Sequence, residues 1–278
     1  MKQNGEPCIL CGSREKELLF QQGEWTIYRC KQCGLGVLEP RPSQERLASL
    51  YRDSYFVTRY DEGAQPGTEA MRKRLSWETH RIRLFKPFLK TGRVLDIGSG
   101  RGYFLLACKE RGYEVEGFDV SDDAAEYVRN TLHIPVTTGN IEDAPFKEGS
   151  FDVVTIWHAL EHMENPRAYL DRVNSLLRPG GLLVVDVPNY LSIDARKYGE
   201  AWDGWSLPYH FFHFTPKTLD QLLSEHGFTV IRRKTYHSEW VKSRLRKIPI
   251  VSLFARLIAK LYHGTSYAVV ARKTGGEK

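Results

Sequence analysis

The sequence lacks long hydrophobic runs, internal repeats and low-complexity tracts, and its charges nearly balance. No apolar stretch in the 278 residues approaches the roughly 18 that a membrane-spanning helix needs. Residues 1–7 are polar, so we expect no signal peptide and a cytoplasmic protein. Forty Lys and Arg against 34 Asp and Glu give a formal net charge of +6, which favours anionic partners without requiring nucleic acid. What remains is an ordinary globular composition, with 41% hydrophobic and 27% charged residues.

Cysteine is also scarce, and a chain of this length can bury a core without disulfides. Of the five cysteines, Cys8 pairs with Cys11 and Cys30 pairs with Cys33, while Cys108 stands alone. In a chain without a leader, close pairs are more often metal ligands than disulfides. Eighteen residues separate the pairs, and a glycine follows each pair where the chain must bend beside an ion. The spacing predicts a structural zinc site filled by four thiolates, with four unliganded thiols as the alternative.

Short apolar runs alternate with helical patterns from residue 92 onward. The runs predict five strands, at 93–97, 114–119, 134–138, 151–157 and 182–187. Because helical patterns separate them, the sequence predicts a parallel sheet built from right-handed crossovers. The following segments are expected to form a helix at 216–226, strands at 228–236 and 266–272, and a basic amphipathic helix over 241–262.

A predicted strand runs directly into a glycine-rich loop at 94–102. The dinucleotide-binding fingerprint requires a glycine at position 103, where this sequence has Tyr103. Asp96 lies at the strand end, where its charge would repel a pyrophosphate but suits an amine or a hydroxyl. Asp119 ends the next strand, nineteen residues after Gly100, and is placed to accept both hydroxyls of a ribose. These residues predict a nucleoside with an ammonium group and no phosphates, a description that S-adenosylmethionine fits.

Four segments between residues 94 and 189 resemble the core of class I S-adenosylmethionine-dependent methyltransferases. They are VLDIGSGRG at 94–102, GFDVS at 117–121, FDVVTIWH at 151–158 and LRPGGLL at 177–183. The resemblance implies an α/β fold with a Rossmann-like sheet and helices on both faces. The expected cofactor-binding residues are Asp96, Gly98, Ser99, Gly100, Gly102, Tyr103, Phe104, Asp119, Val120, Asn140, Ile141 and Trp157. In this resemblance Asp96 and the glycines surround the methionine part, Asp119 holds the ribose, and Val120 flanks the adenine. A Rossmann-like domain that binds nothing is the alternative.

The two ends of the chain resemble one methyltransferase subgroup that carries zinc at its front. The matching segments include RCKQCGLG at 29–36, PRPS at 40–43 and LPYHFFHFTP at 207–216. Members of that subgroup are often associated with surface-polysaccharide and sugar modification. The likeness to sugar C-methyltransferases is limited to a zinc front followed by a methyltransferase core, so we carry over none of their chemistry.

These observations divide the chain into three expected parts. They are a zinc-ribbon-like module at 1–40, a helical lid or linker at 41–90 and the methyltransferase domain at 91–274. Within the domain we expect an aromatic substrate loop at 190–214 and an amphipathic helical insertion at 241–263. The apolar side of the insertion predicts packing or a homodimer contact, and weak docking to a membrane surface is the alternative.

Three residues, His158, Glu161 and His210, are the catalytic candidates. His158 follows a strand beside the expected methyl group, and an imidazole titrates near neutrality, which suits a base for a hydroxyl acceptor. Glu161 is expected to orient His158. The pattern also fits the His-x-x-Glu-His of some zinc peptidases, but Pro166 leaves no room for a long ligand-bearing helix. Two alternatives stay open: Glu161 and His162 only fix the loop, or a divalent cation joins the site.

The sequence therefore favours an S-adenosylmethionine-dependent methyltransferase that acts on a small acceptor. We expect a saccharide, nucleotide sugar or glycan and O-methylation by a histidine base. The alternatives are a ribosomal-RNA type of methyltransferase whose zinc module grips nucleic acid, and a non-catalytic scaffold. Acidic residues dilute the basic surface that an RNA enzyme needs; they are Glu6, Glu15, Glu17, Glu24, Glu39 and Glu45.

Two further groups of side chains have both a functional and a structural interpretation. Trp202, Trp205, Tyr209 and Phe212 would suit stacking on a sugar face, although packing explains them equally well. The cations at 72–74, 81 and 83 predict a solvated helix face, with the lip of a cleft for an anionic acceptor as the alternative.

Overall fold

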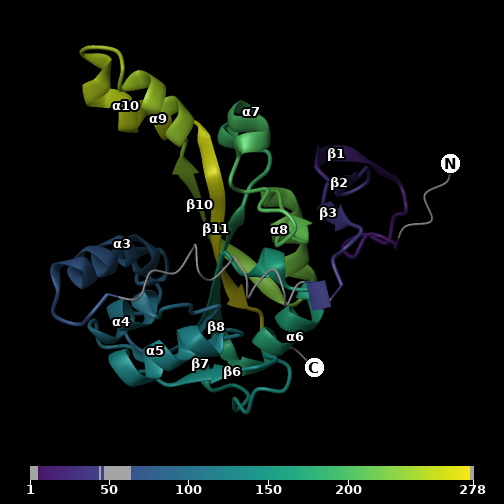
Figure 1. Cartoon of the computed structure of the whole chain (residues 1–278). Helices are drawn as coiled ribbons and strands as arrows, with labels where there is room; N and C mark the ends of the chain where they lie inside the picture. The colour runs from purple at the N-terminus through teal and green to yellow at the C-terminus, as the bar shows by residue number, and fades with distance from the viewer. Residues whose placement is uncertain (1–5, 44, 47–63, 276–278) are drawn as a thin grey trace.

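Two β-sheets form the frame of the protein in the computed structural model, which describes residues 6–43, 45–46 and 64–275 (Figure 1). The strands are β1 Lys16–Gln22, β2 Trp25–Cys30, β3 Gly36–Glu39, β4 Arg93–Ile97, β5 Glu114–Asp119, β6 Val136–Thr138, β7 Phe151–Trp157, β8 Leu177–Pro188, β9 Phe212–His213, β10 Phe228–His237 and β11 His263–Lys273. The helices are α3 Glu69–Phe85, α4 Tyr103–Lys109, α5 Asp122–Leu132, η2 Leu160–His162, α6 Pro166–Leu176, α7 Ile193–Tyr198, η3 Gly199–Ala201, α8 Pro216–Glu225, α9 Glu239–Leu245 and α10 Val251–Ala259. Each helix in this part of the chain falls short of the length and apolarity that a bilayer crossing requires.

Seven strands form the larger sheet, in the order β10-β11-β8-β7-β4-β5-β6. The five strands predicted after residue 92 are parallel, whereas β11 is antiparallel to both β8 and β10. The predicted Rossmann-like α/β fold is confirmed, although the last two strands make the sheet mixed instead of purely parallel. From β4 the chain continues to β5 on one side, and β7 later pairs with β4 on the other. This reversal creates a switch point at the carboxyl ends of β4 and β7, where such sheets bind ligands.

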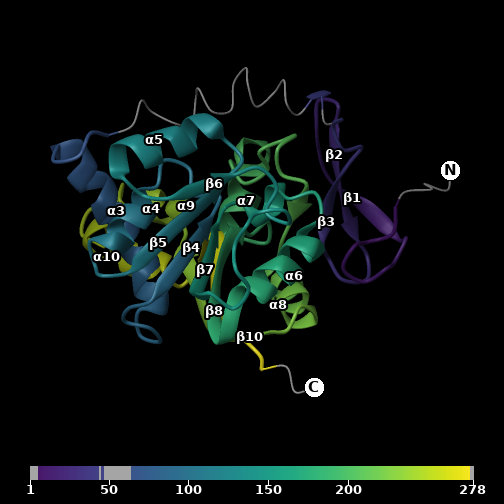
Figure 2. The same cartoon turned by 90° about the horizontal axis from the view of Figure 1, so that it is seen from below.

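Successive residues of the central strands face opposite sides of the sheet. Val94 packs with side chains from α3, α4 and α5, whereas its neighbour Leu95 packs with those from α6 and α8. Figure 2 shows these two groups of helices on either side of the sheet. Both residues are fully buried. Burial on both faces explains why the strands are nearly continuous apolar runs in the sequence.

Three helices begin at residues whose side chains cap the helix. The side chains of Ser121, Asn165 and Thr215 each accept a hydrogen bond from the backbone N–H three residues later, at the starts of α5, α6 and α8. These bonds satisfy donors that a helix start otherwise leaves unpaired. They set the orientation of the helices that cover the sheet.

Some boundaries differ from the sequence expectation. The basic helix expected over 241–262 is two helices, α9 and α10. Pro249 cannot continue a helix, and Ile250 has a left-handed φ of 68°. The region at 41–90 was expected to be helical, and it contains the helix α3. Leu47, Leu50 and Tyr51, whose spacing also predicts a helix, lie outside the described residues.

The segment at 190–214 is more ordered than the loop expected from the sequence. It contains α7, η3 and β9, and β9 pairs with β3 to complete the four-stranded sheet β1-β2-β3-β9. Trp202, Trp205 and Phe212 are buried, and the ring of Trp205 stacks on Phe20 of β1 with centroids 4.4 Å apart. The packing interpretation of these aromatic residues is therefore correct, and they do not present open faces to a sugar.

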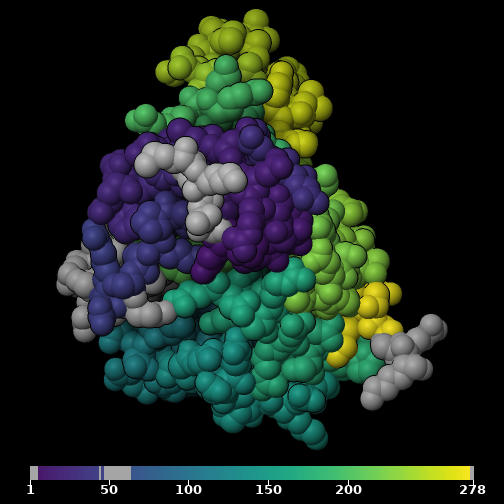
Figure 3. Space-filling model, turned by 90° about the vertical axis from the view of Figure 1, so that its right-hand side faces the viewer, coloured from purple at the N-terminus to yellow at the C-terminus, as the bar shows by residue number. Residues whose placement is uncertain are grey.

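One apolar core extends from the N-terminal module, residues 6–43, into the larger domain. Leu10, Leu35 and Leu38 belong to the same buried cluster as the residues of α6 and α8. The backbone N–H of Leu38 donates to the carbonyl of Phe211 at 2.9 Å. A Cβ on Gly36 would lie 2.8 Å from Cβ of His213, so this close pairing requires a glycine. Figure 3 shows the module, in purple, seated directly against the domain.

Candidate functional site

The structure brings the four predicted metal ligands together. Sγ of Cys8 lies 3.6 Å from Sγ of Cys33, and Sγ of Cys11 lies 3.5 Å from Sγ of Cys30. All four sulfur atoms lie within 4.8 Å of one another, and no disulfide joins them. Tetrahedral zinc with Zn–S bonds of about 2.3 Å needs sulfurs about 3.8 Å apart. The cluster therefore fits a four-thiolate zinc ion.

The two halves of the cysteine cluster repeat one local conformation. The N–H of Gly12 donates to the carbonyl of Cys8 at 2.8 Å, and the N–H of Gly34 donates to that of Cys30 at 2.9 Å. Both glycines have positive φ angles, 72° and 88°. A residue with a side chain would be strained there, which explains the glycine after each cysteine pair.

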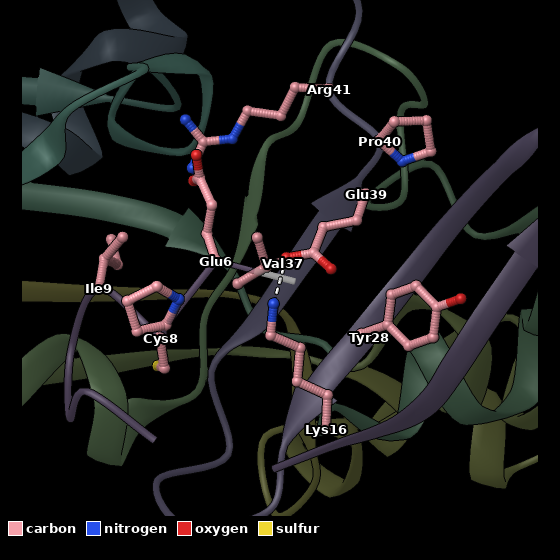
Figure 4. A pocket seen from close by; sticks show the side chains of 10 residues that line it. Glu6, Cys8, Ile9, Lys16, Tyr28, Val37, Glu39, Pro40 and Arg41 are labelled. Atoms are coloured by element: carbon pink, nitrogen blue, oxygen red, sulfur yellow. Dashed lines mark hydrogen bonds and ion pairs between the residues drawn. The ribbon is translucent and has the colours of Figure 1, made fainter. Parts of the chain in front are cut away.

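A hollow of about 560 Å³ lies on the N-terminal module (Figure 4). Its charged lining residues include Lys16 and Glu39, which form an ion pair, as well as Glu6 and Arg41. Among the predicted site residues, only Cys8 lines this hollow. The hollow is therefore separate from the predicted cofactor and catalytic residues.

The glycine loop lies at the switch point, directly after β4. Gly98, Gly100 and Gly102 have φ angles of 78°, 51° and 68°, which glycine adopts without strain. A Cβ on Gly98 would lie 2.8 Å from Cβ of Ala159, so the loop also needs glycine for space. Asp119 holds the loop against β5, because its carboxylate accepts the N–H of Gly100 at 2.7 Å. The loop is thus prepared for close approach of a ligand to its backbone.

The predicted partners of the cofactor differ in exposure. Asp96 is buried and accepts the hydroxyl of Thr155 at 2.5 Å. Burial raises the pKa of Asp96 to about 7, although the bond from Thr155 opposes the shift. Burial also raises the pKa of Asp119, against its hydrogen bonds from backbone N–H groups. Val120 is 67% exposed and available to a flat ring, whereas Ile141 is buried.

The remaining residues predicted to bind the cofactor are Ser99, Tyr103, Phe104, Asn140 and Trp157. Phe104 packs edge-on against Trp157 with centroids 5.3 Å apart, and the hydroxyl of Tyr103 accepts the N–H of Ala64. Asn140 is exposed, and its side chain bonds to the next turn. Two buried polar atoms, Oγ of Ser99 and Nε1 of Trp157, have no hydrogen-bond partner within the described ranges. Buried polar atoms of this kind fit a site that pairs with a polar ligand.

A cluster of acidic and imidazole side chains lies beside the glycine loop. His158 directly follows β7, has a left-handed φ of 51°, and its side chain is 39% exposed. Its Nδ1 lies 3.6 Å from Oε1 of Glu161, and its Nε2 lies 3.7 Å from Oδ2 of Asp186. Both carboxylate oxygens of the buried Glu161 lack a hydrogen-bond partner in the described part of the chain. The ring of His158 is therefore held between two buried carboxylates.

These surroundings give the histidines opposite titration behaviour. Burial opposes the charging of His158, but Asp186 and Glu161 together raise its pKa above the ordinary value. Burial, with His162 and His213 nearby, holds the pKa of His210 well below its ordinary value. Burial lowers the pKa of His213 to about 3. Among these three residues, His158 is the one whose surroundings favour the charged form.

The structure also brings His210 to the cluster. Its Nε2 lies 3.9 Å from Oε1 of Glu161, and its Nδ1 lies 2.9 Å from the carbonyl oxygen of Gly204. Potential donor atoms of Glu161, His162 and His210 lie within 4.8 Å of one another, so a cation could be held here as well. The backbone N–H of Phe211 donates to the carbonyl of Glu161 at 2.8 Å, which connects the 190–214 segment to this site.

The comparisons with known proteins agree with this geometry. A protein-family profile described as a methyltransferase domain matches residues 68–233, which is more than half of the chain. The chain belongs to the class I S-adenosylmethionine-dependent methyltransferases.

This methyltransferase is similar to named proteins mainly over its core. It is 27% identical over 138 residues to a probable S-adenosylmethionine-dependent methyltransferase of Mycolicibacterium smegmatis, with 49% of this chain and 52% of that protein covered. It is 33% identical over 156 residues to a ubiquinone biosynthesis O-methyltransferase of Psychrobacter arcticus, with 49% and 59% covered. A crystal structure of an S-adenosylmethionine-dependent methyltransferase from Archaeoglobus fulgidus matches with a TM-score of 0.56 and 25% identity, covering 74% of this chain and 97% of that one. The chain spans about half the length of the curated relatives it matches.

Sequence reasoning missed two residues of this methyltransferase that border the site. Asp186 is a single carboxylate inside an apolar run of β8, which is an unusual pattern for a buried strand. Arg81 belongs to a charge run that favours a solvated face, yet its guanidinium lies over the ring of Trp157 at 5.0 Å and contacts Glu78 at 2.9 Å. Burial raises the pKa of Asp186 and of Asp96, and the positive charge of Arg81 opposes this rise in both.

The cysteine geometry predicts about one zinc ion per chain of this methyltransferase. Cys30→Ser should lose most of this zinc. It should also change the tryptophan fluorescence, because the metal supplies folding energy to the module on which Trp205 stacks. Elemental analysis and emission spectra measure both effects. Cys108→Ala is the matched control, since Cys108 is buried away from the cluster. Less than half an equivalent of zinc in the wild type, or full zinc in Cys30→Ser, would contradict the assignment.

Proposed function

We propose that this methyltransferase transfers the methyl group of S-adenosylmethionine to a hydroxyl of a small acceptor, with His158 as the general base. The observation that carries the proposal is the position of His158 at the carboxyl end of β7, partly exposed and flanked by two buried carboxylates. The name of the Psychrobacter arcticus relative, an O-methyltransferase, supports a hydroxyl acceptor.

For the cofactor we propose the glycine loop and the strand ends beside it. When bound, S-adenosylmethionine supplies an electrophilic methyl group on a sulfonium. Asp96 and the backbone at 98–102 would hold the methionine part, and Ser99 has a buried hydroxyl without a partner in the described structure. Asp119 can accept ribose hydroxyls with the lone pairs that its two backbone bonds leave free. The exposed Val120 would flank the adenine, with Asn140 at its edge.

In this proposal Nε2 of His158 would take the proton of the acceptor hydroxyl as that oxygen bonds to the methyl carbon and the bond between the methyl carbon and the sulfur breaks, its electron pair remaining on the sulfur. Glu161 faces Nδ1 and keeps the ring in orientation, so it is a positioning residue. Asp186 stabilises the charged ring, and Tyr236 donates to Oδ2 of Asp186 at 3.0 Å. His210 remains neutral because of burial, so we assign it a hydrogen-bonding role in the pocket.

For the acceptor we propose a saccharide, a nucleotide sugar or a glycan. The resemblance of the chain ends to methyltransferases of sugar modification supports this class. The cluster of imidazole and carboxylate groups also supports it, because buried polar groups select acceptors that pair with them. The buried Trp202 and Trp205 add no support.

An RNA acceptor is the weaker alternative. Two basic residues of the N-terminal module pair with acids, Lys16 with Glu39 and Arg29 with Glu17. Such pairs reduce the field that a phosphate backbone would feel. We propose that the module instead has a structural role, with its zinc held by the four cysteines and its β3 supporting the 190–214 segment.

The cofactor assignment predicts that Asp119→Ala weakens S-adenosylmethionine binding by about tenfold or more. The substitution removes charge-assisted hydrogen bonds, each worth about 1.5–3 kcal/mol. Gly100→Val should weaken binding further, because a branched side chain is strained at a φ of 51°. Titration calorimetry measures both. Asp123→Ala, an exposed acid in the first turn of α5, is the control and should bind like wild type. Preference for NADH over S-adenosylmethionine would overturn the assignment.

The base assignment predicts that His158→Ala lowers turnover at saturating cofactor by about 10²- to 10⁴-fold. His158 acts when neutral, so turnover should rise as pH rises through its pKa. Glu161 raises that pKa, and Glu161→Gln should therefore move the acid limb of the pH–kcat profile to lower pH. His263→Ala, at an exposed histidine of β11, is the control.

Two outcomes would contradict the base assignment. If His158→Ala, His210→Ala and Glu161→Gln all keep near-native turnover with unchanged cofactor affinity, alignment of the reactants alone carries the reaction. If the chelator-treated enzyme regains turnover only when Mg²⁺ is added, the reaction depends on a cation held by Glu161, His162 and His210. Glu161 would then be a metal ligand and would not orient His158 as a free base.

A further inference from the structure

The segment at 239–262, which we call the basic hairpin, projects from the body of the protein. It consists of α9, α10 and their connection, and it joins β10 to β11. Figure 1 shows it extending beyond the sheet, and Figure 3 shows it at one end of the molecule, next to α7. Its packing partners are therefore few, and its outer surface is open.

Helix α10 has an inverted pattern of burial. Its small residues Ala255 and Ala259 are buried, whereas three of its large apolar residues, Leu253, Phe254 and Leu257, are exposed. Leu253 is 81% exposed and Leu257 is 65% exposed. Other exposed apolar side chains of the hairpin are Ile248, Ile250, Phe254, Leu261 and Tyr262. A helix that only packs on its own domain would do the reverse, so this face is built for contact with something else.

Apart from Glu239 at its start, which pairs with Lys242, the hairpin carries only positive charge. Residues 240–262 contain six cations and no acid; the cations are Lys242, Arg244, Arg246, Lys247, Arg256 and Lys260. All of these except Lys242 are exposed. Apolar side chains interleaved with cations match a bilayer with anionic headgroups, where the apolar groups enter the acyl boundary and the cations meet phosphates. A second copy of the hairpin would bring like charges together, which disfavours self-association.

The hairpin is held in a fixed orientation. The buried carboxylate of Asp194 on α7 accepts the backbone N–H groups of Glu239 and Trp240 at 3.2 and 3.1 Å, and it also accepts the hydroxyl of Ser238. These bonds occupy the start of α9, where a helix favours negative charge. The outward apolar face is therefore a stable feature of the fold.

We propose that the basic hairpin docks this protein on an anionic membrane surface without crossing the bilayer. Because β10 is antiparallel to β11 and β11 to β8, β10 ends at the same edge of the sheet as β8. The hairpin follows β10 directly, so docking brings the edge that carries His158 toward the bilayer. This proposal stands on the hairpin alone and does not depend on the assigned base or acceptor.

The test is flotation of the full chain with vesicles of equal parts phosphatidylglycerol and phosphatidylcholine, compared with phosphatidylcholine alone. We expect binding to the anionic vesicles only, weakened as salt rises. Leu253→Ser combined with Leu257→Ser should reduce binding by more than about tenfold. Arg256→Gln combined with Lys260→Gln should reduce it by about tenfold or more. Leu18→Ser, at a leucine of β1 that is 61% exposed, is the matched control.

Light scattering of the wild type and the same variants shows whether this face binds a second copy of the protein instead of a membrane. A wild-type dimer that becomes a monomer in Leu253→Ser with Leu257→Ser, without vesicle binding, would assign the face to a second copy and overturn the proposal. A monomer that binds neither vesicle would also overturn it. Equal binding to both vesicles would refute the role of the cations. Circular dichroism checks that the variants remain folded.

Discussion

The pairing of β3 with β9 is the interaction on which the arrangement of the site depends. It places two residues of the 190–214 segment against the N-terminal module, and Gly36 makes the close approach possible. Phe211, immediately before β9, donates to the carbonyl of Glu161, and the carboxylate of Glu161 faces His158. A continuous series of contacts therefore connects the cysteine cluster to the histidine at the switch point. This connection gives the module a physical role in the site even though its cysteines lie outside the cofactor loop.

Burial then determines what each polar group in the site can do. His158 is partly exposed and faces two carboxylates, which favour its charged form. Burial and the neighbouring imidazoles favour the neutral form of His210, and burial favours the neutral form of His213. The same protein thus contains one histidine suited to proton exchange and others suited to neutral hydrogen bonding. A sequence pattern alone treats these histidines as equivalent, since the difference lies in what surrounds them.

Much of the fold was predictable because its signals are local. The glycine loop and the strand end at Asp119 are set by neighbouring residues, and the structure has them where the sequence predicts. The two cysteine pairs were recognisable for the same reason. The pairing of β9 with β3 was not predictable from the sequence. The two strands are far apart in the chain, and β9 is only two residues long. The break between α9 and α10 had a visible signal in Pro249, which the apolar periodicity obscured.

The fold holds His158 between Glu161 and Asp186, and we propose that this position lets it act as a base. The most direct measurement is a pH titration of the histidine side chains by nuclear magnetic resonance, with the His158 signal assigned from the His158→Ala variant. We expect the pKa of His158 to lie above the ordinary value of about 6.5, whereas His210 and His213 should stay neutral over the same pH range. A His158 that titrates at or below that value, or a His210 that becomes charged in its place, would contradict it.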